Sequence, residues 1–264
     1  MRFDAPTTDS TRAALAELRD DVIAATSFLT RLPVARFASD DTGLLARSMR
    51  AFPIVGIVVG LIGWAAFAIA TALALPASIA SLLALVATVL TTGALHEDGL
   101  ADTADGFGGG EDTARKLAIM RDSRSGAFGI IALVFSLALR GAALVALAGS
   151  DTGVGFALIA AHVVSRAALP IVMRQLVPAR SDGLGASAGQ PDDAAIAWCL
   201  GIGIIAALIC FGLTRGILAL LVTAAAVALL AALARRQIGG YTGDVLGAAQ
   251  QIGEITMLLT AAAA

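Results

Sequence analysis

The densest group of chemically capable side chains lies in one fifteen-residue stretch, HEDGLADTADGFGGG. Asp98, Asp102 and Asp105 recur there at i, i+4 and i+7, so in a helix they project from one face within roughly a 60° arc. Carboxylate oxygens suit Mg²⁺, which usually takes one or two carboxylates and shares substrate phosphates. We therefore predict that these aspartates hold Mg²⁺ and act in catalysis, with Glu97 as a further ligand and His96 as a ligand or general base. The alternative is a solvated acidic loop with a few helix caps.

A second polar segment, IMRDSRSGAFG, opens a long apolar stretch. Arg121 and Arg124 lie at i and i+3, so both can face one anion, with Asp122 between them. The start of the following helix offers a partial positive charge to the same anion. These three residues are predicted to bind substrate. A plain membrane anchor with a helix cap is the alternative.

A third polar segment, GGYTGDVLG, carries Asp244 among four glycines. Such a backbone suits a phosphate cradle or close packing on another helix. The following stretch, 245–264, is apolar except for Gln250, Gln251 and Glu254, which are tolerated only when they face a protein interior or a cleft. We predict that Asp244, Gln250 and Glu254 contact substrate. An interfacial helix without a catalytic role remains the alternative.

Two isolated arginines are also candidates for substrate binding. Arg166 lies near the middle of an apolar stretch with His162 one turn earlier, and an arginine at that depth costs about 2.5–3.5 kcal/mol on insertion scales. A structural pairing or a side chain that reaches the membrane surface would also explain it. Arg31 lies in the segment FLTRLPV, which is expected to rest on the membrane surface. Arg140, nearer the end of its apolar stretch, is assigned no role.

The elements that must position these residues are long apolar helices. The chain has 264 residues, of which 58% are hydrophobic and 14% charged, and its mean hydropathy is +0.86. Soluble domains usually have about 25% charged residues, and a soluble bundle would need polar stripes that these segments lack. The sequence predicts an all-α, polytopic membrane protein with about six to seven transmembrane helices, each needing roughly 20 apolar residues. The six apolar windows are about 51–73, 77–95, 126–148, 153–177, 194–213 and 216–234.

The arginines predict the orientation of these helices. If six helices alternate, all but three of the 18 basic residues fall on the side that carries the polar segments. The positive-inside rule then places the N-terminus and the active site in the cytoplasm of a bacterial inner membrane. No signal peptide is expected. We divide the chain into a cytoplasmic extension with an amphipathic helix, 1–27, and an integral membrane domain, 28–264. The net charge of −2 gives no support for binding nucleic acid.

Read together, five segments resemble the cobalamin synthase family: FLTRLPV, FPIVGIVVG, HEDGLADTADGFGGG, IMRDSRSGAFG and GGYTGDVLGAAQQIGE. The resemblance runs from about Phe28 to Glu254. It implies a Mg²⁺-dependent phosphotransferase that completes the nucleotide loop of vitamin B12. In that family, α-ribazole or its 5′-phosphate attacks the cobinamide-bearing phosphate of adenosylcobinamide-GDP and displaces GMP, which yields adenosylcobalamin or its 5′-phosphate.

The resemblance also implies roles for particular residues. It makes Asp98, Asp102 and Asp105 the best metal ligands, with Glu97 and His96 beside them. The polar positions of the other two motifs fall on Asp122, Arg124 and Asp244.

Two other functions are consistent with parts of the sequence. A CDP-alcohol phosphotransferase also carries helically spaced aspartates, but its signature places Ala-Arg after the first Asp-Gly pair, whereas here Asp102 follows Ala101. A cation transporter would need acids at mid-span, where only Glu254 qualifies. The expected partners are adenosylcobinamide-GDP, α-ribazole or its 5′-phosphate, and the lipid bilayer. A homo-oligomer is possible from the sequence, which leaves the oligomeric state open.

Overall fold

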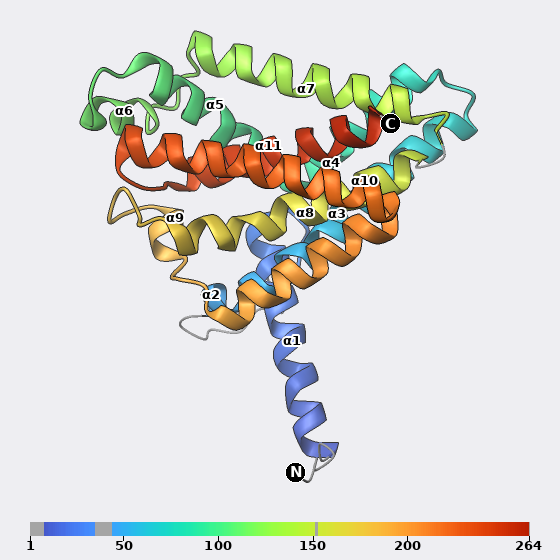
Figure 1. Ribbon diagram of the computed structural model, residues 1–264, viewed down its shortest axis with the longest axis horizontal. Helices are drawn as coiled ribbons and strands as arrows, with labels where there is room; N and C mark the ends of the chain where they lie inside the picture. Colours follow the sequence, from blue (N-terminus) through green and yellow to red (C-terminus); the bar gives the residue numbers. More distant parts are fainter. Residues whose placement is uncertain (1–7, 35–43, 151–152, 264) are drawn as a thin grey trace.

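The computed structural model describes residues 8–34, 44–150 and 153–263, and every element in these ranges is a helix (Figure 1). The all-α prediction is therefore confirmed. The elements in chain order are α1 (Thr8–Leu29), α2 (Leu44–Ser48), the 3₁₀ helix η2 (Met49–Ala51), α3 (Phe52–Ala72), α4 (Ala77–Thr92), α5 (Leu95–Gly109), α6 (Thr113–Ile119), α7 (Ala127–Leu147), α8 (Gly153–Gln175), α9 (Leu184–Ser187), α10 (Asp193–Ile238) and α11 (Gly243–Ala262).

Four helical stretches are long and apolar enough to cross a membrane, and a fifth results if α4 and α5 are counted as one span bent by 89°. The membrane character expected from the sequence is thus supported, but this count is below six to seven. One reason is that α4, with 16 residues, is short for a span. The other is that two of the predicted windows lie in the single long element α10. The four stretches are Leu44–Ala72, Ala127–Leu147, Gly153–Gln175 and Asp193–Ile238.

Within α10 the chain turns back on itself at Gly212. This glycine has φ 75° and ψ 177°, a conformation that residues with a Cβ avoid. A Cβ at Gly216 would lie 2.8 Å from the carbonyl oxygen of Ala207, nine residues earlier, whereas a straight helix would separate them by about 14 Å. The helix therefore consists of two legs, 193–211 and 213–238, that run side by side in opposite directions (Figure 1).

Helix α11 lies inside the bundle, in contact with α5, α7, α8 and α10. Its first turns, including Val245 and Ala249, belong to one hydrophobic cluster, and its last turns, including Met257 and Ala261, belong to a second. The segment between them carries polar side chains that are at most 1% exposed. The prediction that these residues face the protein interior is confirmed.

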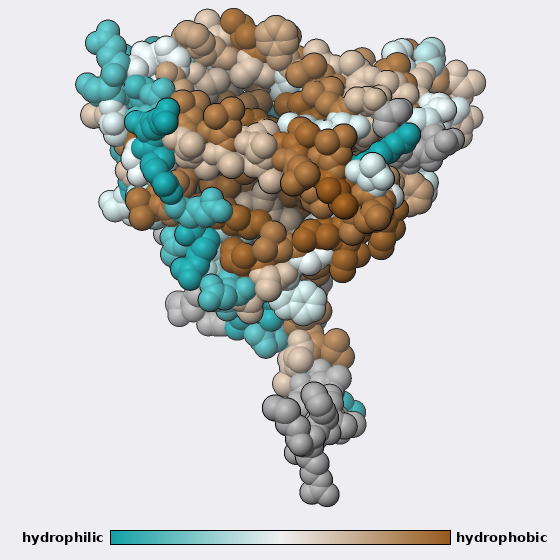
Figure 2. All heavy atoms as spheres, viewed as in Figure 1, coloured by the Kyte–Doolittle hydropathy of each residue, from teal (hydrophilic) through white to brown (hydrophobic). Residues whose placement is uncertain are grey.

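The polar connections between helices gather at one end of the bundle. Thr113 Oγ1 donates to the carbonyl oxygen of Gln237, and Arg235 Nη2 donates to that of Gln175 at 2.9 Å. Figure 2 shows hydrophilic residues along one edge of the molecule and hydrophobic residues over its middle. The arginine-bearing connections thus lie together, as the alternation of six windows predicted.

Helix α1 crosses the boundary that the sequence suggested between residues 27 and 28. Its second half packs on the membrane domain, where Asp21 is fully buried and accepts hydrogen bonds from Arg47, at 2.9 Å, and from Arg50. Leu29 is 1% exposed, so the start of FLTRLPV lies in the core and not on a surface. Only the first half of α1 projects from the body (Figure 1), and residues 1–7 of the predicted extension lie outside the described residues.

Candidate active site

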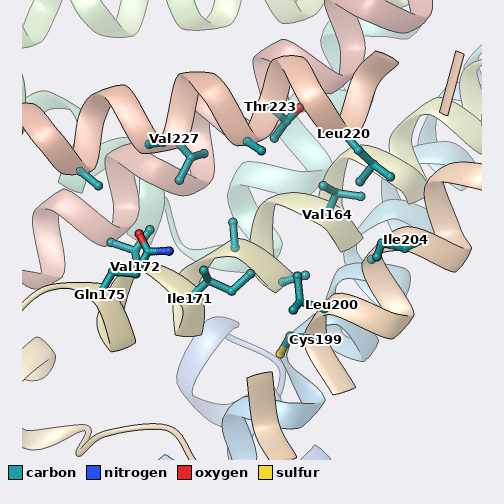
Figure 3. Close-up of a pocket in the computed structure, with 16 residues that line it drawn as sticks. Val164, Ile171, Val172, Gln175, Cys199, Leu200, Ile204, Leu220, Thr223 and Val227 are labelled. Carbon is teal, nitrogen blue, oxygen red and sulfur yellow. The ribbon is translucent and has the colours of Figure 1, made fainter. Parts of the chain in front are cut away.

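Two cavities of similar size differ in chemistry. The first, about 850 Å³, lies between α8 and the two legs of α10 (Figure 3). Its walls are apolar apart from groups such as Gln175 and Thr223, and no charged side chain lines it. Such a cavity offers nothing to activate a reacting group, so it is not the candidate site.

The second cavity, about 830 Å³, lies where α5, α11 and the end of α8 meet α1 and α3. We call it the acidic cavity. Much of its wall is apolar, and its polar side chains come from two of the three motifs and from the connection after α8. The apolar lining side chains are Phe28, Leu29, Met49, Phe52, Leu95, Leu169, Met173, Ala188 and Leu246, and the polar ones are His96, Asp98, Arg180 and Asp244.

A pair of glycines brings α5 and α11 together at this cavity. A Cβ at Gly99 would lie 2.8 Å from the carbonyl oxygen of Asp244, and one at Gly247 would lie 3.1 Å from the Cα of Gly99. Neither position therefore tolerates a side chain without moving a backbone. Because the helices touch here, the aspartates of α5 lie beside Asp244 of α11. The glycines of both motifs serve close helix packing, one of the two roles that the sequence left open.

Three carboxylates interact across this contact. Burial, together with repulsion from Asp98 and Asp244, raises the pKa of Asp102 to about 7. Burial also raises the pKa of Asp244, against the opposing effect of the Arg180 guanidinium. Arg180 Nη2 lies 3.4 Å from Asp244 Oδ2, while its Nη1 has no hydrogen-bond partner in the described part of the chain. The cluster thus carries more negative charge than its neighbours neutralise.

The donor set fits Mg²⁺ that is shared with a phosphate. Among the described residues, no three histidine, cysteine or carboxylate side chains form a ready metal cage. Mg²⁺ needs none, because it commonly binds through one or two carboxylates and completes its shell with water and phosphate oxygens. Burial and the neighbouring carboxylates both raise the pKa of Asp102, and a bound cation would favour its ionised form against both effects.

Two of the four residues predicted as metal ligands point away from this cluster. Asp105 accepts hydrogen bonds from the backbone N–H groups of Gly126, at 2.6 Å, and Gly129, at 2.8 Å, so it caps the start of α7. Glu97 turns to the interior, where its Oε1 accepts from Arg140 Nη1 at 3.1 Å. Helical spacing placed Asp105 on the same face as Asp98. However, the start of α7 packs against that end of α5 and donates hydrogen bonds to both carboxylate oxygens of Asp105.

The second motif stands outside the cavity lining. Arg124 forms a two-pronged pair with Asp122, at 3.0 and 2.6 Å, and Arg121 pairs with Asp182 at 2.5 Å. All four are solvent-exposed. The structure therefore does not bring these predicted substrate ligands to the carboxylate cluster.

The remaining candidates lie apart from the acidic cavity or at its border. Arg31 packs against Gly93 at the end of α4 and does not line the cavity. Arg166, Gln250 and Glu254 belong to a fully buried polar network, in which Arg166 Nη1 lies 3.0 Å from His162 Nδ1. His96 lines both the acidic cavity and a small polar cavity inside that network.

Sequence reasoning missed two arginines. Arg180 was counted only as a basic residue of a connection, and no spacing links it to Asp244, 64 residues later. Arg140 could have been found, because the argument applied to Arg166 holds equally for any arginine inside an apolar stretch. Its guanidinium is 1% exposed and lies between two glutamates.

Comparison with known proteins adds an independent line of evidence. The family model described as cobalamin-5-phosphate synthase matches residues 21–262. A Bradyrhizobium diazoefficiens protein named adenosylcobinamide-GDP ribazoletransferase is 47% identical over 258 residues, covering 98% of this chain and 97% of its own. Proteins of the same name from Rhizobium johnstonii and Mesorhizobium japonicum are 45% and 47% identical, over 92% and 94% of this chain and 96% and 95% of their own lengths. No solved structure matches the chain.

Proposed function

The chain belongs to the cobalamin-5-phosphate synthase family, and on this premise we propose that it is an adenosylcobinamide-GDP ribazoletransferase. In this reaction a ribose hydroxyl of α-ribazole, or of its 5′-phosphate, attacks the phosphorus that carries cobinamide. A new P–O bond forms, the anhydride bond to the guanylate breaks, and GMP leaves. The hydroxyl proton passes to a base in the site.

The observation that carries the proposal is that Asp98 and Asp244 line the acidic cavity with Arg180 beside Asp244, while Asp102 lies close enough to both aspartates for their charges to raise its pKa. Attack on a pyrophosphate needs positioned groups and neutralised oxygen charge, with little covalent work by the protein. The walls of the cavity are largely apolar with a few converging polar groups, as is usual for small-molecule sites.

We assign Mg²⁺ binding to Asp98, Asp102 and Asp244, in place of the set expected from the sequence. When bound, the ion would draw charge from the phosphate oxygens. Arg180 binds a phosphate oxygen through its Nη1, which has no other partner in the described residues. His96 is 3% exposed, and burial favours its neutral ring, which can accept the hydroxyl proton.

We further propose six spans with the acidic cavity on the cytoplasmic side of a bacterial inner membrane. The spans would be α3, α4, α7, α8 and the two legs of α10, with α11 enclosed among them. The turn at Gly212 supports this count, because it divides the longest helix into two segments that run in opposite directions. Since the arginine-bearing connections lie at the end of the bundle that holds the cavity, the positive-inside rule supports the orientation.

The test is release of GMP from adenosylcobinamide-GDP by the purified full chain in lipid vesicles. We expect release that depends on an added acceptor, α-ribazole or its 5′-phosphate, and that stops when EDTA removes Mg²⁺. Release that persists in EDTA would exclude the metal assignment. No release with either acceptor, together with CMP release from a CDP-alcohol, would favour the rival phosphotransferase.

A further inference from the structure

One of the most buried charged side chains in the apolar part of the molecule is shared by three helices. Arg140 of α7 donates from Nη1 to Glu97 Oε1 on α5, at 3.1 Å, and to Glu254 Oε1 on α11, at 3.0 Å. Its Nη2 also donates to Glu97, at 3.2 Å. We call these residues the Arg140 triad. Arg140 and Glu254 are each 1% exposed, and Glu97 is 8% exposed.

Neighbouring amides hold both glutamates in place. Gln251 Nε2 donates to Glu97 Oε1 at 3.1 Å, and Gln250 Nε2 donates to Glu254 Oε2 at 2.9 Å. Ser136 of α7 in turn donates to Gln251 Oε1, at 2.9 Å. Each carboxylate of the triad therefore has one orientation fixed by at least two donors.

Stability alone does not explain this arrangement. Removing charges from water costs several kcal/mol per ion, so replacing a buried ion pair by apolar residues is often neutral or stabilising. Here the arrangement is also incomplete, because Glu97 Oε2 and Arg140 Nε have no hydrogen-bond partner among the described residues. The triad costs free energy of desolvation but fixes the directions of its side chains. It is therefore better explained by a role in orienting the helices that carry it.

The triad lies directly behind the acidic cavity. Glu97 precedes Asp98, and successive residues of a helix point about 100° apart, so the first faces the interior while the second faces the cavity. On α11, Glu254 lies ten residues after Asp244, or roughly 15 Å along the axis. The contact between Gly99 of α5 and Gly247 of α11 lies between Asp244 and Glu254 along the axis of α11. A clamp on Glu97 and Glu254 therefore limits the rotation of α5 about its contact with α11.

We propose that Arg140 is a positioning residue for the transfer reaction. By holding Glu97 and Glu254 it fixes α5 against α11, and with that the separation of Asp98 and Asp102 from Asp244. The role rests on the proposed function, because those three carboxylates are its proposed site. Arg140 itself does not line the cavity.

The test uses Arg140→Lys, with Arg166→Lys as its matched control. Lysine keeps the charge but lacks the planar fork that holds two carboxylates at once. Arg166 is equally buried, but its hydrogen bonds are to His162 on its own helix, and it reaches Glu254 only through that histidine. Lysine at position 166 keeps the charge and leaves the hydrogen bonds of Arg140 to both glutamates in place.

The first readout is independent of catalysis. Spin labels at exposed Glu111, just beyond α5, and at Leu259 on α11 report the distance between the helices, in a chain whose two cysteines are replaced. We expect Arg140→Lys to shift or broaden the distance distribution and Arg166→Lys to leave it as in the parent. Identical distributions in the parent and Arg140→Lys would overturn the proposal, whether or not the chain releases GMP.

The second readout separates positioning from general damage. We expect Arg140→Lys to lower kcat at least tenfold and to raise the Mg²⁺ concentration needed for half the maximal rate, with KM for adenosylcobinamide-GDP changed less. The Mg²⁺ requirement of Arg166→Lys should equal that of the parent. Equal shifts in both variants, or a parental kcat in Arg140→Lys, would overturn the positioning role. If Arg140→Lys does not fold, Glu97→Gln takes its place in both measurements, with the same criteria.

Discussion

The acidic cavity and the Arg140 triad both gather carboxylates around an arginine, but they differ in burial and in charge balance. At the cavity, Asp98 and Asp244 line the wall, Asp102 lies close to both, and one partly exposed guanidinium, Arg180, lies near them. In the interior, the fully buried Arg140 and Arg166 balance two glutamates. Unbalanced negative charge at the wall of an open cavity favours the binding of a cation or a substrate. Carboxylates that are balanced by arginines in a closed interior do not need a ligand. The difference indicates which carboxylates act on ligands and which hold helices.

The largest effect should come from the cavity carboxylates. Asp102→Asn and Asp244→Asn each remove a charge that we assign to the Mg²⁺ site, so we expect transfer to fall by about 100- to 1000-fold, as when a group that stabilises transition-state charge is lost. Initial rates of GMP release measure this. Asp182→Asn serves as the control and should keep the parental rate, because Asp182 is exposed and, among the described residues, forms its ion pair with Arg121. Parental activity in either cavity variant would contradict the conclusion that the cavity carboxylates act on ligands while those of the Arg140 triad hold helices.

A smaller effect is expected from the cavity arginine. Arg180→Gln removes a charged donor that faces the phosphate, and we expect kcat/KM to fall by about 10- to 100-fold, since a hydrogen bond to a charged group contributes about 1.5–3 kcal/mol. Arg124→Gln is the matched control, because that guanidinium pairs with Asp122 outside the cavity. If Arg124→Gln lost more activity than Arg180→Gln, the substrate site would lie at the second motif, as the sequence suggested.

The Mg²⁺ requirement should depend on pH through Asp102. Its pKa, raised from its ordinary value to about 7, means that the folded protein keeps a proton which the unfolded chain releases near pH 4. The stability contributed by this proton is therefore present at low pH and lost as pH rises through 7. Protons compete with the metal, so the Mg²⁺ concentration for half the maximal rate should fall as pH rises from 6 to 7.

Titrations of activity with Mg²⁺ at pH 6, 7 and 8 measure this dependence, and the requirement should level off near pH 8. Asp122→Asn should not change the profile, because the hydrogen bond from Arg124 lowers the pKa of Asp122 to about 2, far from the tested range. A Mg²⁺ requirement independent of pH would exclude Asp102 as a ligand that titrates near 7.

The smallest change in transfer is expected at Asp105, whose two oxygens cap α7. Asp105→Ala should lower the free energy of unfolding by about 0.5–2 kcal/mol through loss of the cap, with little change in the Mg²⁺ requirement. Thermal unfolding in detergent and Mg²⁺ titration measure the two quantities. A Mg²⁺ requirement raised as strongly as by Asp102→Asn would restore Asp105 to the metal site.

Much of the fold could be predicted from composition and spacing. The six apolar windows indicated long helices, and the Thr214–Arg215 break between the last two windows lies next to the turn at Gly212. The spacing of the aspartates placed them on one face if the stretch is helical, and α5 is that helix. These features depend on local periodicity, which is a property of the chain itself.

The composition of the site depended on contacts between helices. Helical spacing tells which residues share a face of one helix, but not which neighbouring helix covers that face. For this reason Asp105 appeared equivalent to Asp98 and Asp102 until α7 was seen to occupy its oxygens, and Arg180 was not linked to Asp244 at all.

By itself, the sequence determined that this protein is an all-helical membrane protein of the cobalamin-5-phosphate synthase family, whose polar motifs lie at one end of a bundle. Only the tertiary structure decided which acids meet. The close contact of Gly99 with Gly247 brings Asp244 to Asp98 and Asp102, while Arg140 draws Glu97 to the interior. The physical reason is that carboxylates on different helices are combined by packing, which no spacing along the chain encodes.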